Sequence, residues 1–430
     1  MKMFFLFFLL GHIACVPPTL NKTKAGDCCN PTAKPTPSLP SITRHFIYVS
    51  DVTGSTGAIN RFLINETTGE LVNVGQINGN FSNYSITVSS NNKFLFATGA
   101  GSEIVNGITE SFSRISSFFI NQSNGDLTLI NTIKLTTGTV NANATQVTVH
   151  PSNKFVYVTD GRYQPAGGIF VLSVSPLGVM SFVTTINAGG LNYPHGISFS
   201  SDGNFAIATN FAGYDPSTGT DRAGFGTGDT ISAFTVDQTT GSLNWLTGTG
   251  RYGAFEGTSA NAKDPRFSIF DPNKNIIYVM DANGAPPRLS SWRYDPTTGV
   301  PTVQGSVSSS NTAGTGGWGV AQTKNGRFIF TAVRNATTIS SYYISPTSDV
   351  PFFSGDVTTS GSRPCSISIH PDLNFVYVSH QASPHINVFL YDYGSGLLSP
   401  TISPVSMLPL APGSSGARGQ STTIATTFGI

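Results

Sequence analysis

Short runs of alternating hydrophobic and polar residues recur along the chain, separated by turn residues. The clearest run is FVYV at 155–158, which follows a His-Pro-Ser-Asn-Lys turn. In other copies such a strand is followed by a loop, a third strand, a Thr-Thr-Gly turn and a fourth strand, in that order. Runs of four to eight residues rich in β-branched and aromatic side chains are typical of strands. Helical periodicity is absent. The pattern predicts an all-β chain built from four-stranded units.

Seven copies of the second strand are present, and successive copies start 47 to 71 residues apart. They occupy residues 46–49, 94–97, 155–158, 205–208, 276–279, 328–331 and 375–378. This spacing is close to that of four-stranded propeller blades, which close into a ring without long exposed edges. We therefore predict a seven-bladed β-propeller with four-stranded blades over residues 44–430.

The first copy lacks its own first strand. Residues 34–40 read KPTPSLP, and prolines cannot serve an inner strand of a sheet. Residues 421–427 align with the first strands of the other copies, such as 84–90 and 365–371. We therefore predict that the C-terminal strand completes the N-terminal blade and closes the ring.

The N-terminus is typical of an exported protein. Residues 1–15 have a lysine, an apolar stretch too short to span a bilayer and small residues at the end, which predicts a signal peptide. A bacterial lipoprotein signal ending at Cys15 is the alternative, but His12 stands where such signals have an aliphatic residue. Residues 16–43 form a leader rich in Pro, Ser and Thr. We expect a secreted, soluble protein, with the cell wall as a candidate location.

Charge excludes several classes of partner. The chain has 23 Lys+Arg against 22 Asp+Glu, only 10% of residues are charged, and no basic cluster occurs. Binding to nucleic acid or to an anionic membrane surface needs such a cluster. We therefore expect no nucleic-acid partner. No second long apolar run occurs, so we expect no membrane span, and we expect a monomer.

Glycosylation and disulfide formation are both expected in a secreted chain. Seven Asn-x-Ser/Thr sites qualify for glycosylation in a eukaryotic source: Asn21, Asn65, Asn80, Asn83, Asn121, Asn143 and Asn335. Without Cys15 the chain keeps Cys28, Cys29 and Cys365, and an odd count predicts one disulfide plus one remaining thiol. Which of the adjacent pair would bond Cys365 stays open.

One residue per copy is expected at the mouth of the central channel, because the start of the innermost strand faces the channel. Counting six residues back from each turn gives Tyr84, Thr145, His195, Arg266, Trp318, Cys365 and Ser421. A guanidinium and an imidazole on adjacent blades can bind and polarise a carboxylate or a lactone carbonyl. Trp318 could stack on a sugar ring. The simpler interpretation is that these polar side chains only contact water in the channel.

Long connections on the same rim add further candidates. Arg222 lies in the connection 211–230 and Glu256 in the connection 248–264. By contrast, His150 and His370 belong to the turns of the opposite rim, where we expect a structural role. No motif has the spacing of a metal site or requires a cofactor.

These repeats and mouth residues resemble the lactonase family of seven-bladed propellers, which includes bacterial-type 6-phosphogluconolactonases and fungal carboxymuconate-cyclising enzymes. The resemblance spans residues 44–428 and rests on the HPSNKFVYV and TTGxL repeats. It implies a site with a His and an Arg at strand starts, matched by His195 in YPHGISF and Arg266 in DPRFSI. It implies catalysis by these two residues on a small lactone, by hydrolysis or by lactone-forming cyclisation.

Other positions depart from the family pattern. Ala282 stands where the family has a Glu, with Asp281 one place before, and Cys365 stands where a later Arg is expected, with Arg363 two places before. Asp281 is the candidate third catalytic residue, and Arg363 is a candidate for substrate binding. The alternative is a non-enzymatic secreted glycoprotein of the cell wall or extracellular matrix that uses the propeller as a binding scaffold.

Overall fold

The structure is a computed structural model, and all of its described residues belong to the compact unit Thr43–Ile430. It describes residues 44–51, 57–78, 82–106, 108–136, 144–161, 167–187, 191, 193–211, 214–215, 220–221, 229–246, 251–252, 265–281, 286–310, 316–401, 403–407 and 421–426.

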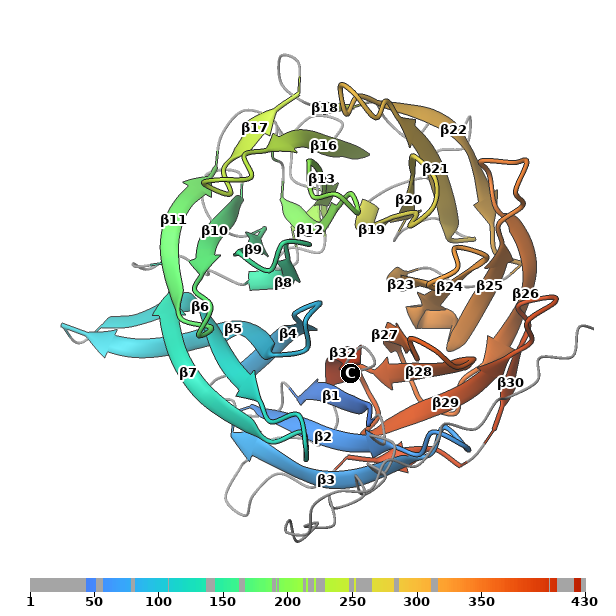
Figure 1. Cartoon of the computed structure of the whole chain (residues 1–430), viewed down its shortest axis with the longest axis horizontal. Helices are drawn as coiled ribbons and strands as arrows, with labels where there is room; N and C mark the ends of the chain where they lie inside the picture. Colours follow the sequence, from blue (N-terminus) through green and yellow to red (C-terminus); the bar gives the residue numbers. More distant parts are fainter. Residues whose placement is uncertain are drawn as a thin grey trace, which may run out of the picture. The chain divides into compact units, whose positions relative to one another are not determined.

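The described residues of this unit form seven antiparallel sheets of four or five strands, which we call blades 1 to 7 in chain order, and one further two-stranded sheet (Figure 1). Blade 1 contains β1 (Phe46–Asp51), β2 (Ala58–Ile64), β3 (Leu71–Asn78) and β32 (Ser421–Thr426). Blade 2 contains β4 (Ser82–Val88), β5 (Phe94–Val105), β6 (Ile108–Ile120) and β7 (Leu127–Lys134). Blade 3 contains β8 (Ala144–Val149), β9 (Phe155–Asp160), β10 (Gly168–Val174) and β11 (Met180–Ile186).

Blade 4 contains β12 (Pro194–Phe199), β13 (Phe205–Phe211), β16 (Asp229–Val236), β17 (Leu243–Trp245) and β18 (Arg251–Tyr252). The short strands β14 (Tyr214–Asp215) and β15 (Thr220–Asp221) pair with each other between β13 and β16. Blade 5 contains β19 (Pro265–Phe270), β20 (Ile276–Asp281), β21 (Arg288–Tyr294) and β22 (Pro301–Ser308).

Blade 6 contains β23 (Gly317–Gln322), β24 (Phe328–Val333), β25 (Thr338–Tyr343) and β26 (Phe352–Thr358), with the 3-10 turn η1 (Arg334–Ala336) after β24. Blade 7 contains β27 (Pro364–Ile369), β28 (Phe375–His380), β29 (His385–Tyr391), β30 (Leu398–Pro400) and β31 (Val405–Ser406). The predicted all-β, seven-bladed architecture is confirmed.

The innermost strands form the ring around the channel. In sequence they are β4, β8, β12, β19, β23 and β27, and each contacts the innermost strand of the next blade. β32 lies between β27 and β4 and pairs with β1, in the sheet order β3-β2-β1-β32. The C-terminal strand therefore completes the first blade and closes the ring, as the sequence predicts.

The glycine of the Thr-Thr-Gly turn, and of its Ser-Asn-Gly counterpart in blade 2, fits against the aromatic strand of the preceding blade. Gly125 and Gly241 have φ of +72° and +75°, and an added Cβ would lie 2.5 Å from a ring carbon of Phe46 and Phe155, respectively. Tyr157 of the same strand donates its hydroxyl to the carbonyl oxygen of Gly241 at 2.6 Å. Glycine is required there because only a residue without Cβ allows both this backbone conformation and this contact.

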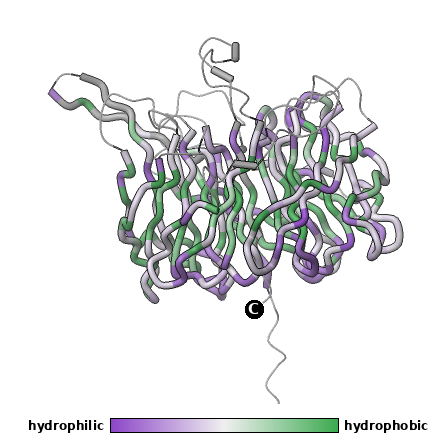
Figure 2. The backbone as a smooth tube through the Cα atoms, turned by 90° about the horizontal axis from the view of Figure 1, so that it is seen from above, coloured by the Kyte–Doolittle hydropathy of each residue, from purple (hydrophilic) through white to green (hydrophobic). Residues whose placement is uncertain are grey.

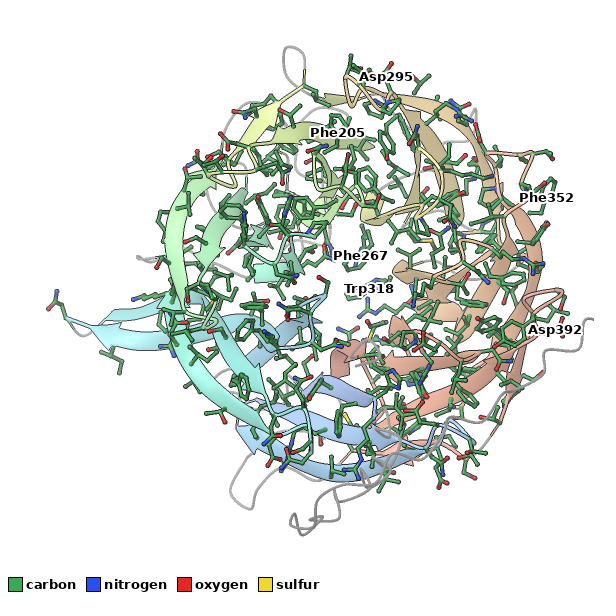
Figure 3. The ribbon with its side chains drawn as sticks, in the orientation of Figure 1. Phe205, Phe267, Asp295, Trp318, Phe352 and Asp392 are labelled. Atoms are coloured by element: carbon green, nitrogen blue, oxygen red, sulfur yellow. The ribbon has the colours of Figure 1, made fainter. Side chains whose placement is uncertain are left out.

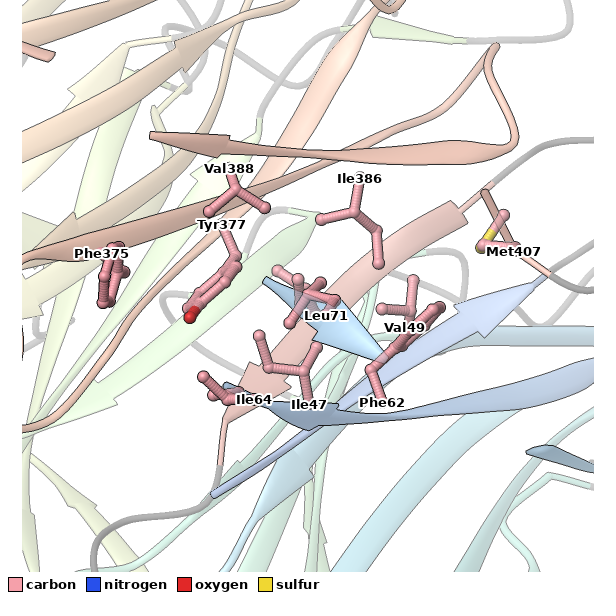
Figure 4. Packing of buried hydrophobic residues seen from close by; sticks show 11 residues of the cluster. Ile47, Val49, Phe62, Ile64, Leu71, Phe375, Tyr377, Ile386, Val388 and Met407 are labelled. Carbon is pink, nitrogen blue, oxygen red and sulfur yellow. The ribbon is translucent and has the colours of Figure 1, made fainter. Parts of the chain in front are cut away.

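The hydrophobic core lies between neighbouring blades. Figure 4 shows the cluster that joins the first and last blades, where Ile47 and Phe62 pack with Tyr377 and Ile386, all buried. In the side view of Figure 2, hydrophobic residues run along the strands and hydrophilic residues gather in the lower turns. Since burial of one such side chain contributes roughly 1.5–3 kcal/mol, this seam contributes strongly to closing the ring.

Candidate functional site

A β-bulge marks each predicted mouth residue in the six innermost strands from β4 to β27. The pairing of each strand with its neighbour skips one residue. The skipped residues are Tyr84, Thr145, His195, Arg266, Trp318 and Cys365. A bulge bends the strand and redirects the side chain of its extra residue. The backbone therefore has the same irregularity at all six positions, and only the side chains differ.

Hydroxyl groups of the preceding blade hold the backbone of the two central mouth residues. The carbonyl oxygen of His195 accepts hydrogen bonds from the Thr145 and Thr159 hydroxyls at 2.9 and 2.8 Å. The carbonyl oxygen of Arg266 accepts one from the Thr209 hydroxyl at 2.6 Å. These partly buried bonds fix the positions from which the imidazole and the guanidinium project.

The imidazole of His195 is neutral at physiological pH. Burial, and then the positive charge of Arg266, lower the pKa of His195 well below 6.5, while a hydrogen bond to the Arg266 backbone opposes the shift. The ring packs edge-on against Phe267, with ring centroids 5.0 Å apart. The neutral ring keeps a lone pair, which a general base needs, while burial and the Arg266 charge both disfavour the protonated form.

Two guanidinium groups stack on the indole of Trp318. The Cζ atoms of Arg266 and Arg334 lie 4.1 and 4.4 Å from the ring centroid. The His195 ring is 6.3 Å from the same indole. In Figure 3 Trp318 lies near the centre of the ring, with Phe267 close by. The structure thus brings together three of the predicted mouth residues and one arginine that sequence reasoning missed.

His195 and Trp318 border a cavity of about 640 Å³ in the channel, whereas Arg266 and Arg334 contact the Trp318 indole without lining that cavity. Its lining includes Thr145, Gln146, His195, Phe267, Trp318, Cys365 and Gln381. The lining mixes hydroxyl, amide, imidazole and aromatic groups, and the volume lies within the range of small-molecule sites. The cavity is therefore suited to a ligand of the size of a sugar or small lactone.

Asp281 and Arg363 do not border this cavity. Asp281 ends β20 and is only 1% exposed, at the same place in its strand as Asp160, which accepts a hydrogen bond from the Ser113 hydroxyl at 2.6 Å. Arg363 is exposed and has a φ of +58°. Their proposed roles in catalysis and substrate binding stay predictions.

Several other predicted residues cannot be placed in the site. Arg222 and Glu256 lie outside the described residues, and Tyr84 is described only as part of β4. Among the predicted glycosylation sites, Asn65 and Asn335 are exposed, Asn121 is partly buried and Asn83 lies in β4. Asn21, Asn80 and Asn143 are outside the described residues, as are Cys28 and Cys29.

The thiol of Cys365 is enclosed at the mouth of blade 7. The residue is 3% exposed, and its Sγ lies 3.6 Å from the carbonyl oxygen of Ser379. Burial raises the pKa of Cys365 to about 12. A protonated, enclosed thiol is a poor nucleophile, so this position offers packing in place of the cation expected from the family resemblance.

One group among the described residues resembles a metal site. The ligand atoms of His45, Glu66 and His370 lie within 4.8 Å of one another. However, the backbone N–H groups of Asp372 and Leu373 both donate to His370 Nδ1, so Nε2 carries the proton and donates to Glu66 at 2.9 Å. A metal would need the lone pair of that Nε2. The group therefore acts as a hydrogen-bonded link between blades 7 and 1.

Within the described part of the chain, no helix has the length and apolar character that crossing a membrane requires.

Comparison with known proteins identifies the same architecture. The family described as "Lactonase, 7-bladed beta-propeller" matches residues 103–213 and 223–408, more than half of the chain. No curated protein matches. Among solved structures, a periplasmic gluconolactonase of Pseudomonas aeruginosa has a TM-score of 0.70 at 17% identity, over 89% of this chain and 99% of that chain. A candidate 6-phosphogluconolactonase of Bacteroides uniformis has a TM-score of 0.69 at 17% identity, over 90% of this chain and 99% of that chain.

Proposed function

Because the chain belongs to the lactonase family of seven-bladed β-propellers, we propose that it hydrolyses a small lactone at the mouth of its central channel. The observation that carries the proposal is the neutral imidazole of His195 beside the guanidinium of Arg266, both projecting from bulges at the mouth. The gluconolactonase of Pseudomonas aeruginosa, similar in fold, agrees with a lactone as the ligand.

The reaction uses these two side chains in distinct roles. His195 takes a proton from a water molecule, whose oxygen attacks the lactone carbonyl carbon. The guanidinium of Arg266 binds the carbonyl oxygen as it becomes negative. The ring C–O bond then breaks, the leaving oxygen takes the proton from the imidazolium, and a hydroxy acid is released. The same groups can run the reverse step, so lactone-forming cyclisation is the second reaction compatible with the site.

The proposal includes the location of the protein. The predicted signal peptide and the exposed Asn65 and Asn335 support a secreted glycoprotein. Treatment of protein from its native source with an N-glycosidase should increase its electrophoretic mobility. An unchanged mobility would contradict the glycoprotein part alone.

The catalytic proposal is tested by acid release from a panel of sugar and muconate-type lactones. We expect Arg266→Ala to lower kcat/KM by about 100-fold or more, because the oxyanion loses its charged partner. Arg327→Ala is the matched control, since Arg327 also stacks on an aromatic ring, Phe328 at 5.3 Å, at the far end of β24. Wild-type turnover no higher than that of Arg266→Ala across the panel would favour the binding scaffold.

A further inference from the structure

The wall of the channel changes character further along the innermost strands, below the mouth residues. Blades 2, 3, 4 and 7 line the cavity there with partly exposed hydroxyl and amide side chains: Thr87, Gln146, Thr148, Ser198 and Ser366. Blades 5 and 6 line it with partly exposed apolar side chains: Phe267, Ile269 and Val320. The described part of the cavity therefore has a polar wall and an apolar wall, each formed by consecutive blades.

The apolar wall comes from a local change in the repeat of blade 5. Phe267 and Ile269 follow the skipped residue of β19 by one and three positions, where β8 has Gln146 and Thr148. Residues two apart lie on the same face of a strand, so β19 presents an apolar pair where β8 presents a polar one. The neighbouring β12 has Gly196 at the first position, and an added Cβ there would lie 3.3 Å from the Phe267 ring. Glycine in blade 4 therefore leaves room for the aromatic side chain, which lies near the centre of the ring (Figure 3).

The groups of the polar wall are engaged between blades. The Thr148 hydroxyl donates to the carbonyl oxygen of Ile197 at 2.9 Å, and the Ile197 N–H donates to Gln146 Oε1 at 2.7 Å. The hydroxyls of Ser198 and Ser268 form a hydrogen bond with each other at 2.6 Å. A ligand hydroxyl that replaced one of these bonds would gain little, because one hydrogen bond is exchanged for another. The polar wall therefore offers a hydroxyl-rich ligand fewer partners than its composition implies.

The cavity is longer than a lactone ring. His195 at the mouth and Ser198 further down both line it, and three residues of strand between them span about 10 Å. A ring whose carbonyl lies beside His195 leaves the lower part of the cavity, with Ile269 and Val320, to another part of the ligand. Pockets that bind small molecules gain affinity by removing such apolar walls from water.

We propose that the substrate is a lactone with an alkyl substituent, which lies in the channel against Phe267 and Ile269 while the ring carbonyl stays beside His195. The alkyl group covers the apolar wall and leaves the hydrogen bonds of the polar wall intact. Blade 5 thereby determines which lactones are accepted, and blade 4 supplies the general base. The inference rests on the proposed function for the identity of the reacting group as a lactone.

The experiment compares three lactones with the same ring and side chains of increasing length. δ-Valerolactone has no side chain, δ-octalactone has a propyl group and δ-decalactone has a pentyl group. Each methylene removed from water should raise kcat/KM by about two- to fourfold, so we expect δ-decalactone to exceed δ-valerolactone by about 30-fold or more. The gain should appear mainly in KM, because the side chain is bound equally in the ground state and the transition state.

Two substitutions of Ile269 test the apolar wall from opposite directions. Ile269→Thr gives blade 5 the residue that blade 3 has at this position, and it should remove at least about fivefold of the gain for δ-decalactone. Ile269→Phe narrows the channel and should lower kcat/KM for δ-decalactone by a similar factor. Both variants should keep kcat/KM for δ-valerolactone within about twofold. Ile369→Thr is the matched control, since Ile369 is also a partly buried isoleucine of an innermost strand, β27, but does not line the cavity.

The outcomes separate this inference from the proposed function. Turnover that does not rise with chain length, or a gain that persists in both Ile269 variants, overturns the alkyl site and leaves the lactonase proposal standing. If no lactone is turned over, calorimetric titration with δ-decalactone and δ-valerolactone replaces the rate. Binding of δ-decalactone that is at least tenfold tighter, and that loses this advantage in Ile269→Thr but not in Ile369→Thr, supports the alkyl site. Equal binding of the two lactones, or no binding, overturns it.

Discussion

Blades 4 and 7 have the same backbone at the channel mouth but different chemistry. In each blade a proline opens the innermost strand, and the next residue is skipped in the pairing: His195 in β12 and Cys365 in β27. The carbonyl oxygen of His195 accepts hydrogen bonds from two threonine hydroxyls. One of them, Thr159, is the fifth residue of the second strand of the preceding blade.

At the mouth of blade 7 the threonine equivalent to Thr159 is replaced. The fifth residue of β24 in blade 6 is Ala332, which is buried and has no side-chain donor. The Cys365 thiol lies near Ser379 of its own blade instead. The same bulge therefore presents a polar, titratable side chain in one blade and a buried, packed side chain in another. Threonine hydroxyls hold the backbone of the bulge where we propose catalysis. Three predictions test this contrast.

The largest expected effect concerns acid stability and a buried histidine of blade 7. His380 donates from Nδ1 to the carbonyl oxygen of His385 at 3.1 Å, and burial lowers the pKa of His380 from 6.5 to about 4. Because the unfolded chain takes up this proton first, stability falls as pH drops from 6.5 towards 4. The loss from this group should reach about 2 kcal/mol at pH 5.

Urea unfolding of wild type and His380→Gln at pH 7 and pH 5 measures how much of the free energy of unfolding is lost through His380. We expect the variant to lose about 2 kcal/mol less between the two pH values, because glutamine takes up no proton. The pH dependence of lactone turnover, which we assign to His195, should keep its shape. Identical losses of stability in both proteins would remove His380 as the cause.

A middle-sized effect is expected from the hydroxyl that supports His195. Thr159→Val removes a donor from the His195 carbonyl oxygen, and Thr98→Val removes the equivalent hydroxyl in blade 2, which donates to Ser85 at 3.4 Å. Both variants should lose about 1 kcal/mol of stability. Only Thr159→Val should also lower kcat/KM, by several-fold, as measured by acid release. Equal kinetics in the two variants would mean that this support does not position His195.

The smallest expected effect is the absence of a reaction at Cys365. Its thiol is buried and has a pKa raised to about 12, so the native protein at pH 8 should resist iodoacetamide at this position. Peptide mass mapping should find the modification only after unfolding. Rapid labelling of native protein would show that the mouth of blade 7 is open and reactive, contrary to the contrast drawn above.

Sequence reasoning located the mouth positions because the repeat is regular. Counting from the His-Pro turn reached His195, Arg266 and Trp318. In the structure His195 and Trp318 line one cavity, and Arg266 stacks on Trp318. It did not reach Arg334, because the count followed the start of the first strand only. The signal existed in the sequence, since Arg334 follows its aromatic strand at the same distance as Ala282 follows the strand of blade 5.

The sequence by itself determined the number of blades, the strand order and the closing strand. These features depend on local alternation and on turn residues that recur along the chain, and each copy can be interpreted without knowing its neighbours. The tertiary structure alone decided which side chains share a site. Arg266 and Arg334 are far apart in sequence, and their meeting on Trp318 depends on the packing of two consecutive blades. Likewise, the low exposure of Asp281 and Cys365 results from neighbouring strands that no local pattern describes.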